Sequence, residues 1–411
     1  MSPPLGLYRI GAVTAPLEGI RILDLTQALS GPVATRILGD LGAEIIKIEP
    51  REVGEVGRRM GVSFVEGEGV YFMIYNRNKK GITLDLRTEK GKAVFHRLVQ
   101  VSDVVFDNFR PGVMARLGAD YQTVRAITPS IICCSVSGYG KDGPYRDRPV
   151  FDSVIQGVSG AMSVTGEPGG PPAVMGFAVS DIGGGWGATV GILAALTARE
   201  RTGEGREVDI SMLDVQLTFQ GHLTELYLGG GVVPQAGGSV QSANLPNGAF
   251  LTKDGKYLQL HCATQKFYQV LADILAANVK GFEGLPQDQR FTSMDGRREN
   301  WDELKALLET AFATKTASQW MDLLGDEVPL APVNDIADAF NDPQVLHRNM
   351  LVEAEHPVAG RYKMPGNPVK MGQEDVFRPA PTLGQHNREV LGDLLGYTEE
   401  EMRALEGDKV I

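Results

Sequence analysis

The sequence predicts an α/β fold in which helices cover both faces of a parallel sheet. Two observations lead to this prediction. Short β-rich runs alternate with helical patterns through the first third of the chain, which is typical of repeated β-α-β units. The chain also has 411 residues, 43% of them hydrophobic, so it can bury a large core without disulfides or a structural metal. This length further predicts more than one domain.

The first expected strand is Ile20–Leu25, and the second is Ala43–Ile48. Between them a helical pattern runs over Val33–Leu41 and ends at Gly42. The same alternation continues, with expected strands at Ile82–Leu86, Asp103–Asp107 and Ile131–Val136 and expected helices at Lys90–Val101 and Tyr121–Ile127. Ligands in parallel sheets bind at the carboxyl ends of strands, so the loops after strands are where a site is expected.

The second half of the chain has a different composition. Glycine, proline and serine accumulate between Gly229 and Gly248, which indicates a passage between domains or an active-site loop. A hairpin that begins at Phe250 and turns at residues 253–256 follows, with helices at Lys266–Ala277 and Trp301–Phe312. These elements predict a small α+β domain. The remaining segment is rich in proline and is expected to be extended.

Composition and motifs exclude several classes of protein. The 40 Lys and Arg residues against 51 Asp and Glu residues give a net charge of −11, which argues against a nucleic-acid surface. No metal-binding histidine pair and no Walker loop occur, and we expect no metal, nucleotide or redox cofactor. The apolar run Ile182–Ala198 is expected to be a buried helix rather than a membrane span. Three cysteines without a secretory signal predict a cytoplasmic protein.

The most informative segment surrounds Asp181. A strand is expected at Ala173–Val179, followed by Asp181, three glycines at 183–185 and the long apolar helix. A carboxylate at such a corner faces the positive end of the helix dipole, with open space in front of it. Two interpretations remain open, a helix cap and a nucleophile for covalent catalysis. Asp152 has two interpretations as well, a second acid or base and a cap for its own helix.

Basic residues lie in the loops between the early strands. Most such residues are solvated surface charges, but guanidinium groups beside strand ends also suit a phosphorylated ligand. The residues concerned are Arg51, Arg58, Arg59, Arg77, Lys79, Lys80, Arg87, Arg110 and Arg116.

Several separated motifs, in order, resemble the class III CoA-transferases, a family that also includes acyl-CoA racemases. The resemblance spans about residues 16 to 400. Its motifs are Pro16–Thr26, Asp40–Glu49, Asn76–Lys80, Asp107–Gly112, Ser137–Gly140, Asp181 with its glycines, and Leu383–His386.

The resemblance implies a Rossmann-like large domain built from both chain ends, with a smaller α+β domain inserted late. It implies domain limits of 16–225 and 226–334, with 335–411 returning to the large domain. It also implies an interlocked homodimer, or a heteromer with a sister subunit. The expected ligands are acyl-CoA and a free carboxylic acid, with no partner nucleic acid or membrane.

The resemblance also assigns roles to residues. Asp181 falls on the family's catalytic nucleophile. Backbone N–H groups near Gly183 and Gly184 are expected to stabilise an oxyanion, and Gly237 and Gly238 to form a lid. Coenzyme A is expected to contact Gln27, Ala28, Leu29, Arg51, Leu84, the run to Arg87, Asn108, Phe109, Arg116 and Val150.

One position separates the branches of the family. The racemases carry a Gly-His-Asp pattern where this chain has Val150, Phe151 and Asp152. Because phenylalanine moves no proton, racemisation is disfavoured. We therefore expect reversible transfer of CoA from a donor such as succinyl-CoA to a small dicarboxylic acid. An acyl-CoA racemase and a CoA-binding subunit of a heteromer remain as alternatives.

Overall fold

The computed structural model describes residues 15–241, 244–372 and 375–411. The chain forms two compact units. The first comprises the chain up to Ala161 together with 175–225 and 343–411, and the second comprises 162–174 and 226–342. Residues 162–174 thus group with the second unit, whereas the sequence analysis placed them in the large domain.

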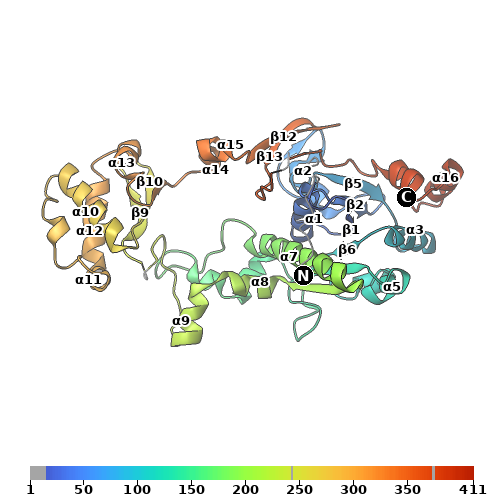
Figure 1. Ribbon diagram of the computed structural model, residues 1–411, viewed down its shortest axis with the longest axis horizontal. Helices are drawn as coiled ribbons and strands as arrows, with labels where there is room; N and C mark the ends of the chain where they lie inside the picture. The colour runs from blue at the N-terminus through green and yellow to red at the C-terminus, as the bar shows by residue number, and fades with distance from the viewer. Residues whose placement is uncertain (1–14, 242–243, 373–374) are drawn as a thin grey trace, which may run out of the picture. The chain divides into compact units, whose positions relative to one another are not determined.

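The first unit is built on a six-stranded parallel sheet, as predicted (Figure 1). The strand order is β5-β2-β1-β6-β7-β8. After β1 the chain forms β2 and β5 on one side of β1, and it then returns to form β6, β7 and β8 on the other side. The connections that leave the neighbouring strands β1 and β6 therefore run in opposite directions along the sheet. This is the Rossmann order, in which a ligand crevice opens between β1 and β6. The bounds are β1 Arg21–Asp24, β2 Glu44–Glu49, β5 Lys79–Thr83, β6 Val104–Asp107, β7 Ile132–Ser137 and β8 Glu207–Ser211.

Four of the expected strands and all three helices expected between strands lie within three residues of their predicted bounds, but β5 as a whole lies three residues before the expected Ile82–Leu86. The structure pairs Lys79 and Lys80 with Ile45 and Ile46 of β2. The reason is that Lys79 is buried and paired with an acid, so its charge does not keep it out of the sheet.

Helices cover both faces of the sheet (Figure 1). Successive strand residues point to opposite faces, so Ile22 joins the core under α1 and α7, and Leu23 joins the core under α3 and α5. The helix bounds in this unit are α1 Ser30–Asp40, α2 Val70–Tyr75, α3 Glu89–Gln100, α4 Val113–Arg116, α5 Tyr121–Ile127, α6 Asp152–Val158, α7 Val179–Thr202, α8 Met212–Phe219 and α16 Glu399–Gly407.

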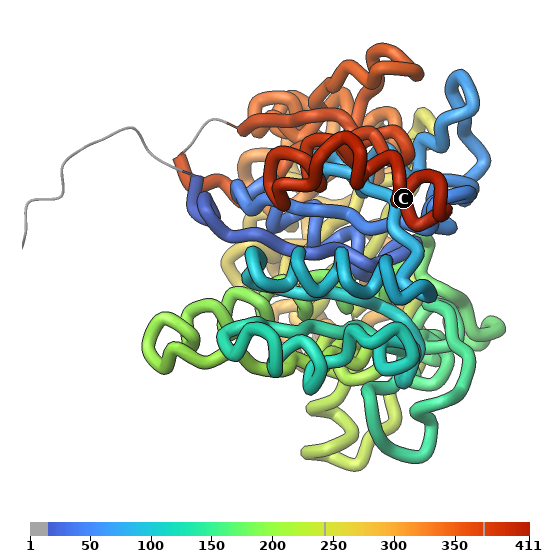
Figure 2. The backbone as a smooth tube through the Cα atoms, turned by 90° about the vertical axis from the view of Figure 1, so that its right-hand side faces the viewer, coloured from blue at the N-terminus to red at the C-terminus, as the bar shows by residue number. Residues whose placement is uncertain are grey.

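The end of the chain packs beside its beginning, as the red C-terminal helix and blue strands show in Figure 2. Val410 and Ile411 share a core with Leu84 and Leu86, and the N–H of Asp85 donates to the Val410 carbonyl at 2.8 Å. Before α16, this segment forms the antiparallel hairpin of β12, Leu351–His356, and β13, Gly360–Pro365.

The second unit contains the predicted hairpin, here β9, Asn247–Leu251, and β10, Tyr257–His261, with β11, Leu330–Pro332, at its edge. Phe250 stacks on Phe312, which also contacts Trp320. The helices are α9 His222–Gly230, which joins the two units, α10 Gln265–Asn278, α11 Met294–Glu299, α12 Trp301–Phe312, α13 Ala317–Leu324 and α14 Ile336–Asn341.

The expected strand at Ala173–Val179 is wrong. Residues 173–178 form no regular element, and α7 begins at Val179 itself. The N–H of Met175 instead donates to the Gln156 side chain at 2.8 Å.

Helix α7 is long and apolar enough to cross a membrane by length and composition, and half of its most apolar stretch is buried inside the protein. It packs along α1 and over β7 and β8. The structure therefore uses it as a core helix, as the sequence predicts.

Candidate active site

The crevice between β1 and β6 is closed by a reciprocal pair of hydrogen bonds. The N–H of Gln27, after β1, donates to the Asn108 side chain at 2.8 Å, and the Asn108 amide donates to the Gln27 carbonyl at 2.8 Å. The same amide donates to the Ser30 hydroxyl at 3.1 Å. The Ser30 hydroxyl in turn lies near enough to the carboxyl of Asp181 to lower its pKa. Asn108 and Ser30 therefore link the crevice to the surroundings of Asp181.

A cavity of about 540 Å³ lies at the carboxyl ends of β1, β2 and β5. It brings together five of the ten predicted CoA contacts: Gln27, Arg51, Leu84, Arg87 and Phe109. Most of its remaining wall is apolar, and it includes Leu25, Ile48, Leu86 and Leu117. An apolar cleft of this size with guanidinium groups suits a nucleotide-like ligand.

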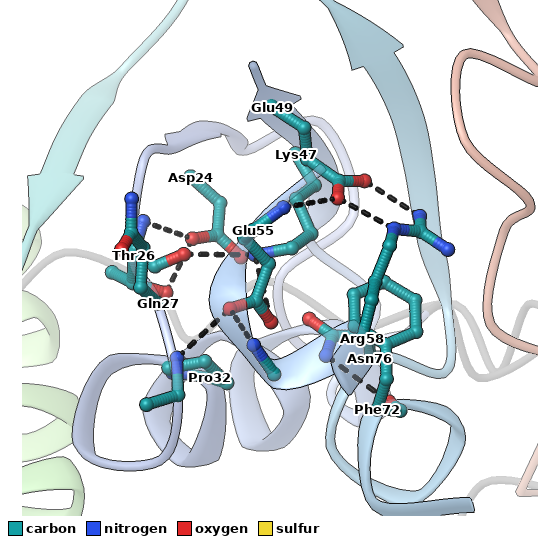
Figure 3. A network of polar contacts seen from close by, with 12 residues as sticks. Asp24, Thr26, Gln27, Pro32, Lys47, Glu49, Glu55, Arg58, Phe72 and Asn76 are labelled. Carbon is teal, nitrogen blue, oxygen red and sulfur yellow. Dashed lines mark hydrogen bonds and ion pairs between the residues drawn. The ribbon is translucent and has the colours of Figure 1, made fainter. Parts of the chain in front are cut away.

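The loop from Gln27 to Leu29 is fixed from behind by a buried carboxylate (Figure 3). Ala28 has a φ of +60°, a left-handed conformation that costs energy for a residue with a Cβ. Its N–H donates to Glu55 at 3.0 Å, and Glu55 also accepts from Gly57 at 2.7 Å. Leu29 is buried and precedes the first residue of α1. The loop therefore presents its backbone to the cavity in one defined conformation.

Buried charges support this carboxylate (Figure 3). The Lys47 ammonium lies 4.0 Å from Glu55 and donates to the Thr26 carbonyl at 2.8 Å. Asp24 pairs with Lys79 at 2.9 Å. Burial opposes the charged form of Asp24, but Lys47 and Lys79 hold its pKa below the usual range. Burial lowers the pKa of Lys79 to about 8. Sequence reasoning missed this network, although charges inside the apolar runs of β1 and β2 were a visible signal.

The other predicted CoA contacts have different surroundings. Asn108 holds the loop, as described, but does not line the cavity. Arg116 ends α4 beside Leu117, which does line it, and Val150 packs in the core on the α1 face of the sheet. Arg87 is largely exposed and pairs with Asp85 at 2.8 Å, which leaves it free to exchange that partner for a phosphate. Of the remaining basic residues, Arg58 and Arg77 are committed to ion pairs with Glu49 and Asp40.

Asp181 is not a helix cap, and that interpretation is wrong. It is the third residue of α7, whose cap position is Ala178 with no side-chain cap. The cap comes from another helix, because an Asp152 oxygen accepts from the N–H groups of Ser180 at 2.7 Å and Asp181 at 3.2 Å. Asp152 therefore caps α7 and not its own helix, which corrects the second expectation. Gln156 donates to its other oxygen at 2.6 Å and holds it in place.

The carboxyl of Asp181 is half-buried, and burial raises its pKa to about 6. The negative charge of Asp152 acts in the same direction, and the Ser30 hydroxyl opposes it. Burial raises the pKa of the Tyr71 phenol, on α2, far above its usual range, and the negative charge of Asp181 acts in the same direction. Tyr71 therefore remains neutral. At neutral pH Asp181 is thus mostly ionised yet poorly solvated, which suits a nucleophile.

The glycines after Asp181 do not serve as an oxyanion hole, contrary to expectation. Gly183, Gly184 and Gly185 are buried inside α7, where backbone N–H groups bond within the helix. They allow close packing instead. A Cβ at Gly183 would lie 2.5 Å from Phe219, and one at Gly185 would lie 2.6 Å from the Ser30 carbonyl.

Gly237 and Gly238 belong to the second unit, where the N–H of Gly238 donates to the Gly166 carbonyl at 2.9 Å. Their role as a lid stays a prediction. Among the described residues, no group of three or more His, Cys, Asp and Glu side chains is arranged to hold a metal ion.

Comparisons with known proteins agree with this architecture. The model of CoA-transferase family III matches residues 17–387. The chain is 36% identical over 393 residues to the mouse succinyl-CoA:glutarate CoA-transferase, covering 95% of this chain and 89% of that protein. It is 40% identical to the acetyl-CoA:oxalate CoA-transferase of Acetobacter aceti, covering 90% and 93%. A crystal structure of a CaiB/BaiF family protein from Brucella suis matches with a TM-score of 0.81 and 33% identity, covering 92% of this chain and 99% of that one.

Proposed function

Because this chain belongs to CoA-transferase family III and is a CoA-transferase, we propose that it moves coenzyme A from succinyl-CoA to a small dicarboxylic acid, with Asp181 as the covalent nucleophile. The observation that carries the proposal is the link from the cavity through Asn108 and Ser30 to the surroundings of a half-buried carboxylate. Coenzyme A in the cavity and its thioester at Asp181 would occupy the two ends of this link.

The chemistry of Asp181 fits nucleophilic catalysis. A carboxylate in the first turn of α7 faces the positive end of the helix dipole, which favours the ionised form. Partial burial removes water that would otherwise shield the oxygen, and the raised pKa of about 6 makes it more basic than an exposed Asp.

The reaction proceeds through two anhydrides and one enzyme thioester. An Asp181 oxygen attacks the donor thioester carbonyl, the carbon–sulfur bond breaks, and CoA leaves as a thiolate. The thiolate attacks the Asp181 carbonyl of the mixed anhydride and releases the donor acid as a carboxylate. The acceptor carboxylate then attacks the aspartyl-CoA thioester and expels the thiolate. Attack of the thiolate on the acceptor carbonyl yields the new acyl-CoA and regenerates Asp181.

Each step exchanges one activated acyl group for another, so the cycle consumes no ATP and needs no metal. The protein has to exclude water, because water would hydrolyse both the anhydride and the thioester. The buried flank of Asp181, formed by Ser180, Gly183 and Gly184, contributes to this exclusion.

The dicarboxylate and succinyl-CoA parts of the proposal are supported by relatives whose names specify glutarate or oxalate as acceptor. Racemisation is not favoured, since Phe151 occupies the position of the racemase base and is 81% exposed.

A homodimer is part of the proposal. Apolar side chains are exposed on α6 and α8 and at their ends, among them Val154, Val158, Leu217 and Phe219. Contiguous exposed apolar groups are typical of a protein interface. Light scattering after size exclusion should give twice the mass of 44.4 kDa, whereas a monomer would contradict this part. We also place the enzyme in the cytoplasm.

The test is mass spectrometry of CoA esters after incubation in D2O with succinyl-CoA, a branched acyl-CoA and a pool of acids. A new ester of a dicarboxylic acid, absent with Asp181→Ala, is the expected result. Deuterium gained by the branched ester without any new ester would establish a racemase. Transfer at the wild-type rate by Asp181→Ala would contradict the covalent mechanism.

A further inference from the structure

Arg36, in the middle of α1, carries a guanidinium group that the protein does not pair. Its Nε is buried without a hydrogen-bond partner, and no ion pair forms with any acid among the residues that the structure describes. Burial and the nearby charge of Arg77 both lower its pKa. Arg36 as a whole is partly exposed, and a partly buried charge without a partner favours an anion supplied from outside the chain.

The fully buried arginines show that this chain normally satisfies such groups. Arg77 is fully buried and binds Asp40 through two nitrogens, at 2.9 and 2.6 Å. Arg297 is 1% exposed and donates to two backbone carbonyls and to Gln265. Arg36 differs from both in this respect.

The nearest acid is not available to Arg36. Asp40, one helical turn away, is engaged by Arg77 and also accepts from Asn78 at 2.8 Å. Asp40 therefore pairs with Arg77 alone, and the cluster of Arg36, Arg77 and Asp40 keeps one excess positive charge. A carboxylate is the natural complement, because guanidinium groups bind it through two parallel hydrogen bonds.

The unpaired group lies on the same wall as Asp181. Its guanidinium stands 5.7 Å from the ring centre of Tyr75, and the Tyr75 ring meets the Tyr71 ring edge-on at 5.1 Å. Tyr71 in turn is close enough to Asp181 for that charge to act on its pKa. These aromatic rings pack in one cluster with Trp186 of α7.

Helix α1 sets the spacing of this wall. Ser30, whose hydroxyl acts on the pKa of Asp181, is six residues before Arg36, which is roughly 9 Å along the helix axis and about 120° around it. Helical side chains tilt toward the helix N-terminus, so the Arg36 side chain starts in the direction of Ser30.

We propose that Arg36 binds the carboxylate of the dicarboxylic substrate that does not react at Asp181. This inference rests on the proposed function and adds the residue that distinguishes dicarboxylic from monocarboxylic acids. The reacting carboxylate lies at the aspartyl-CoA thioester, the methylenes lie along Tyr71 and Tyr75, and the distal carboxylate pairs with Arg36.

The test compares acceptors that differ only in the distal carboxylate. With acetyl-CoA as donor, kcat and KM are measured for glutarate and for pentanoate, using the purified full chain and Arg36→Gln. We expect the KM for glutarate to rise about 10- to 100-fold, as for a lost hydrogen bond to a charged group. The KM for pentanoate and for acetyl-CoA should change less than about twofold, because neither ligand needs the distal contact.

Two controls separate recognition from stability. Arg125→Gln removes a guanidinium group that also stands 5.7 Å from the centre of a tyrosine ring, but on α5. This variant should leave the KM for glutarate unchanged. Arg36→Lys retains the charge and should recover part of the affinity. The melting temperature of Arg36→Gln should change little, because the variant loses no hydrogen bond or ion pair of the protein and only the contact with the Tyr75 ring.

If Arg36→Gln changed the KM for glutarate and for pentanoate equally, or changed neither, the assignment of Arg36 would be overturned. The proposed function would still stand in that case, provided that the wild-type enzyme transfers CoA to glutarate. A wild-type enzyme that accepts pentanoate but no dicarboxylic acid would overturn both. A marked fall in melting temperature with Arg36→Gln and Arg36→Lys alike would make Arg36 a structural residue.

Discussion

Replacing Asp152 by Asn removes a negative charge beside Asp181 while keeping an oxygen that caps α7. The Asn carbonyl can still accept from Ser180 and Asp181, at the sites where Asp152 accepts at 2.7 and 3.2 Å. Only the hydrogen bond from Gln156 is lost, because the NH2 group of Gln156 would face the NH2 group of the new Asn side chain. The variant therefore tests charge separately from capping.

The size of the effect follows from the pKa of Asp181. That pKa is raised from 3.8 to about 6, by burial first and by the charge of Asp152 second. The whole rise of roughly two units corresponds to about 3 kcal/mol. Since burial is the larger cause, removing the Asp152 charge should lower the pKa of Asp181 only part of the way back toward 3.8. The other polar groups that face Asp181, Ser30 and Tyr71, stay neutral through this range and keep their effect.

The assay is kcat/KM for CoA transfer between pH 4.5 and 8. Only the ionised carboxylate attacks, so the wild-type rate should rise with pH through about 6, and the Asp152→Asn rate should rise at a lower pH, between 3.8 and about 6. Asp152→Ala also removes the cap, and it should cost about 1 kcal/mol of stability as well. An acidic limb that does not move in Asp152→Asn, or that moves to higher pH, would refute the reasoning.

Three further predictions concern stability and binding. Asp181→Asn should stabilise the protein by up to about 3 kcal/mol above pH 6 and by nothing below pH 4. The reason is that a carboxyl whose pKa is raised in the folded state lowers the free energy of unfolding as pH rises from 3.8 to about 6. Urea unfolding at pH 4 and at pH 7.5 measures the difference. Gly185→Ala should cost about 1 to 3 kcal/mol, since its Cβ would lie 2.6 Å from the Ser30 carbonyl, whereas Gly407→Ala, with open space around it, should be neutral in the same melts. Glu55→Ala should raise the KM for acyl-CoA about 10-fold with a smaller effect on kcat, because the Ala28 loop loses its anchor; steady-state kinetics would contradict this if kcat alone fell.

Much of the fold was predictable because its elements follow local rules. The β-α-β alternation gave the parallel sheet, and α5 and α12 lie at their predicted bounds. The shifted start of β5 and the false strand at Ala173–Val179 share a cause. In both places a distant partner decides the structure: an acid from β1 for Lys79 and the side chain of Gln156 for Met175.

The site was predictable residue by residue but not in its connections. Asp181 and Gln27 were both singled out, and the structure joins them through Asn108 and Ser30. Ser30 itself was missed, because a serine before a helical pattern looks like an ordinary cap. The role of Asp152 was assigned to the wrong helix, since 28 residues separate it from the first N–H that it caps.

The glycines illustrate a second limit of sequence reasoning. Three consecutive glycines after an acidic residue match both an anion-binding loop and a closely packed helix. Only the position of neighbouring elements decides between them, and here Gly183 meets α8 while Gly185 meets α1. The unpaired state of Arg36 is equally invisible in the sequence, because it depends on Arg77 taking Asp40.

The most direct measurement of the central claim is peptide mass spectrometry of the enzyme quenched in acid during turnover with succinyl-CoA. The account predicts a thioester adduct, equal to CoA less one water, on the α7 peptide that contains Asp181, and no adduct with Asp181→Asn freshly prepared. An adduct on any other side chain, or steady transfer by a wild-type enzyme in which Asp181 is never modified, would contradict it.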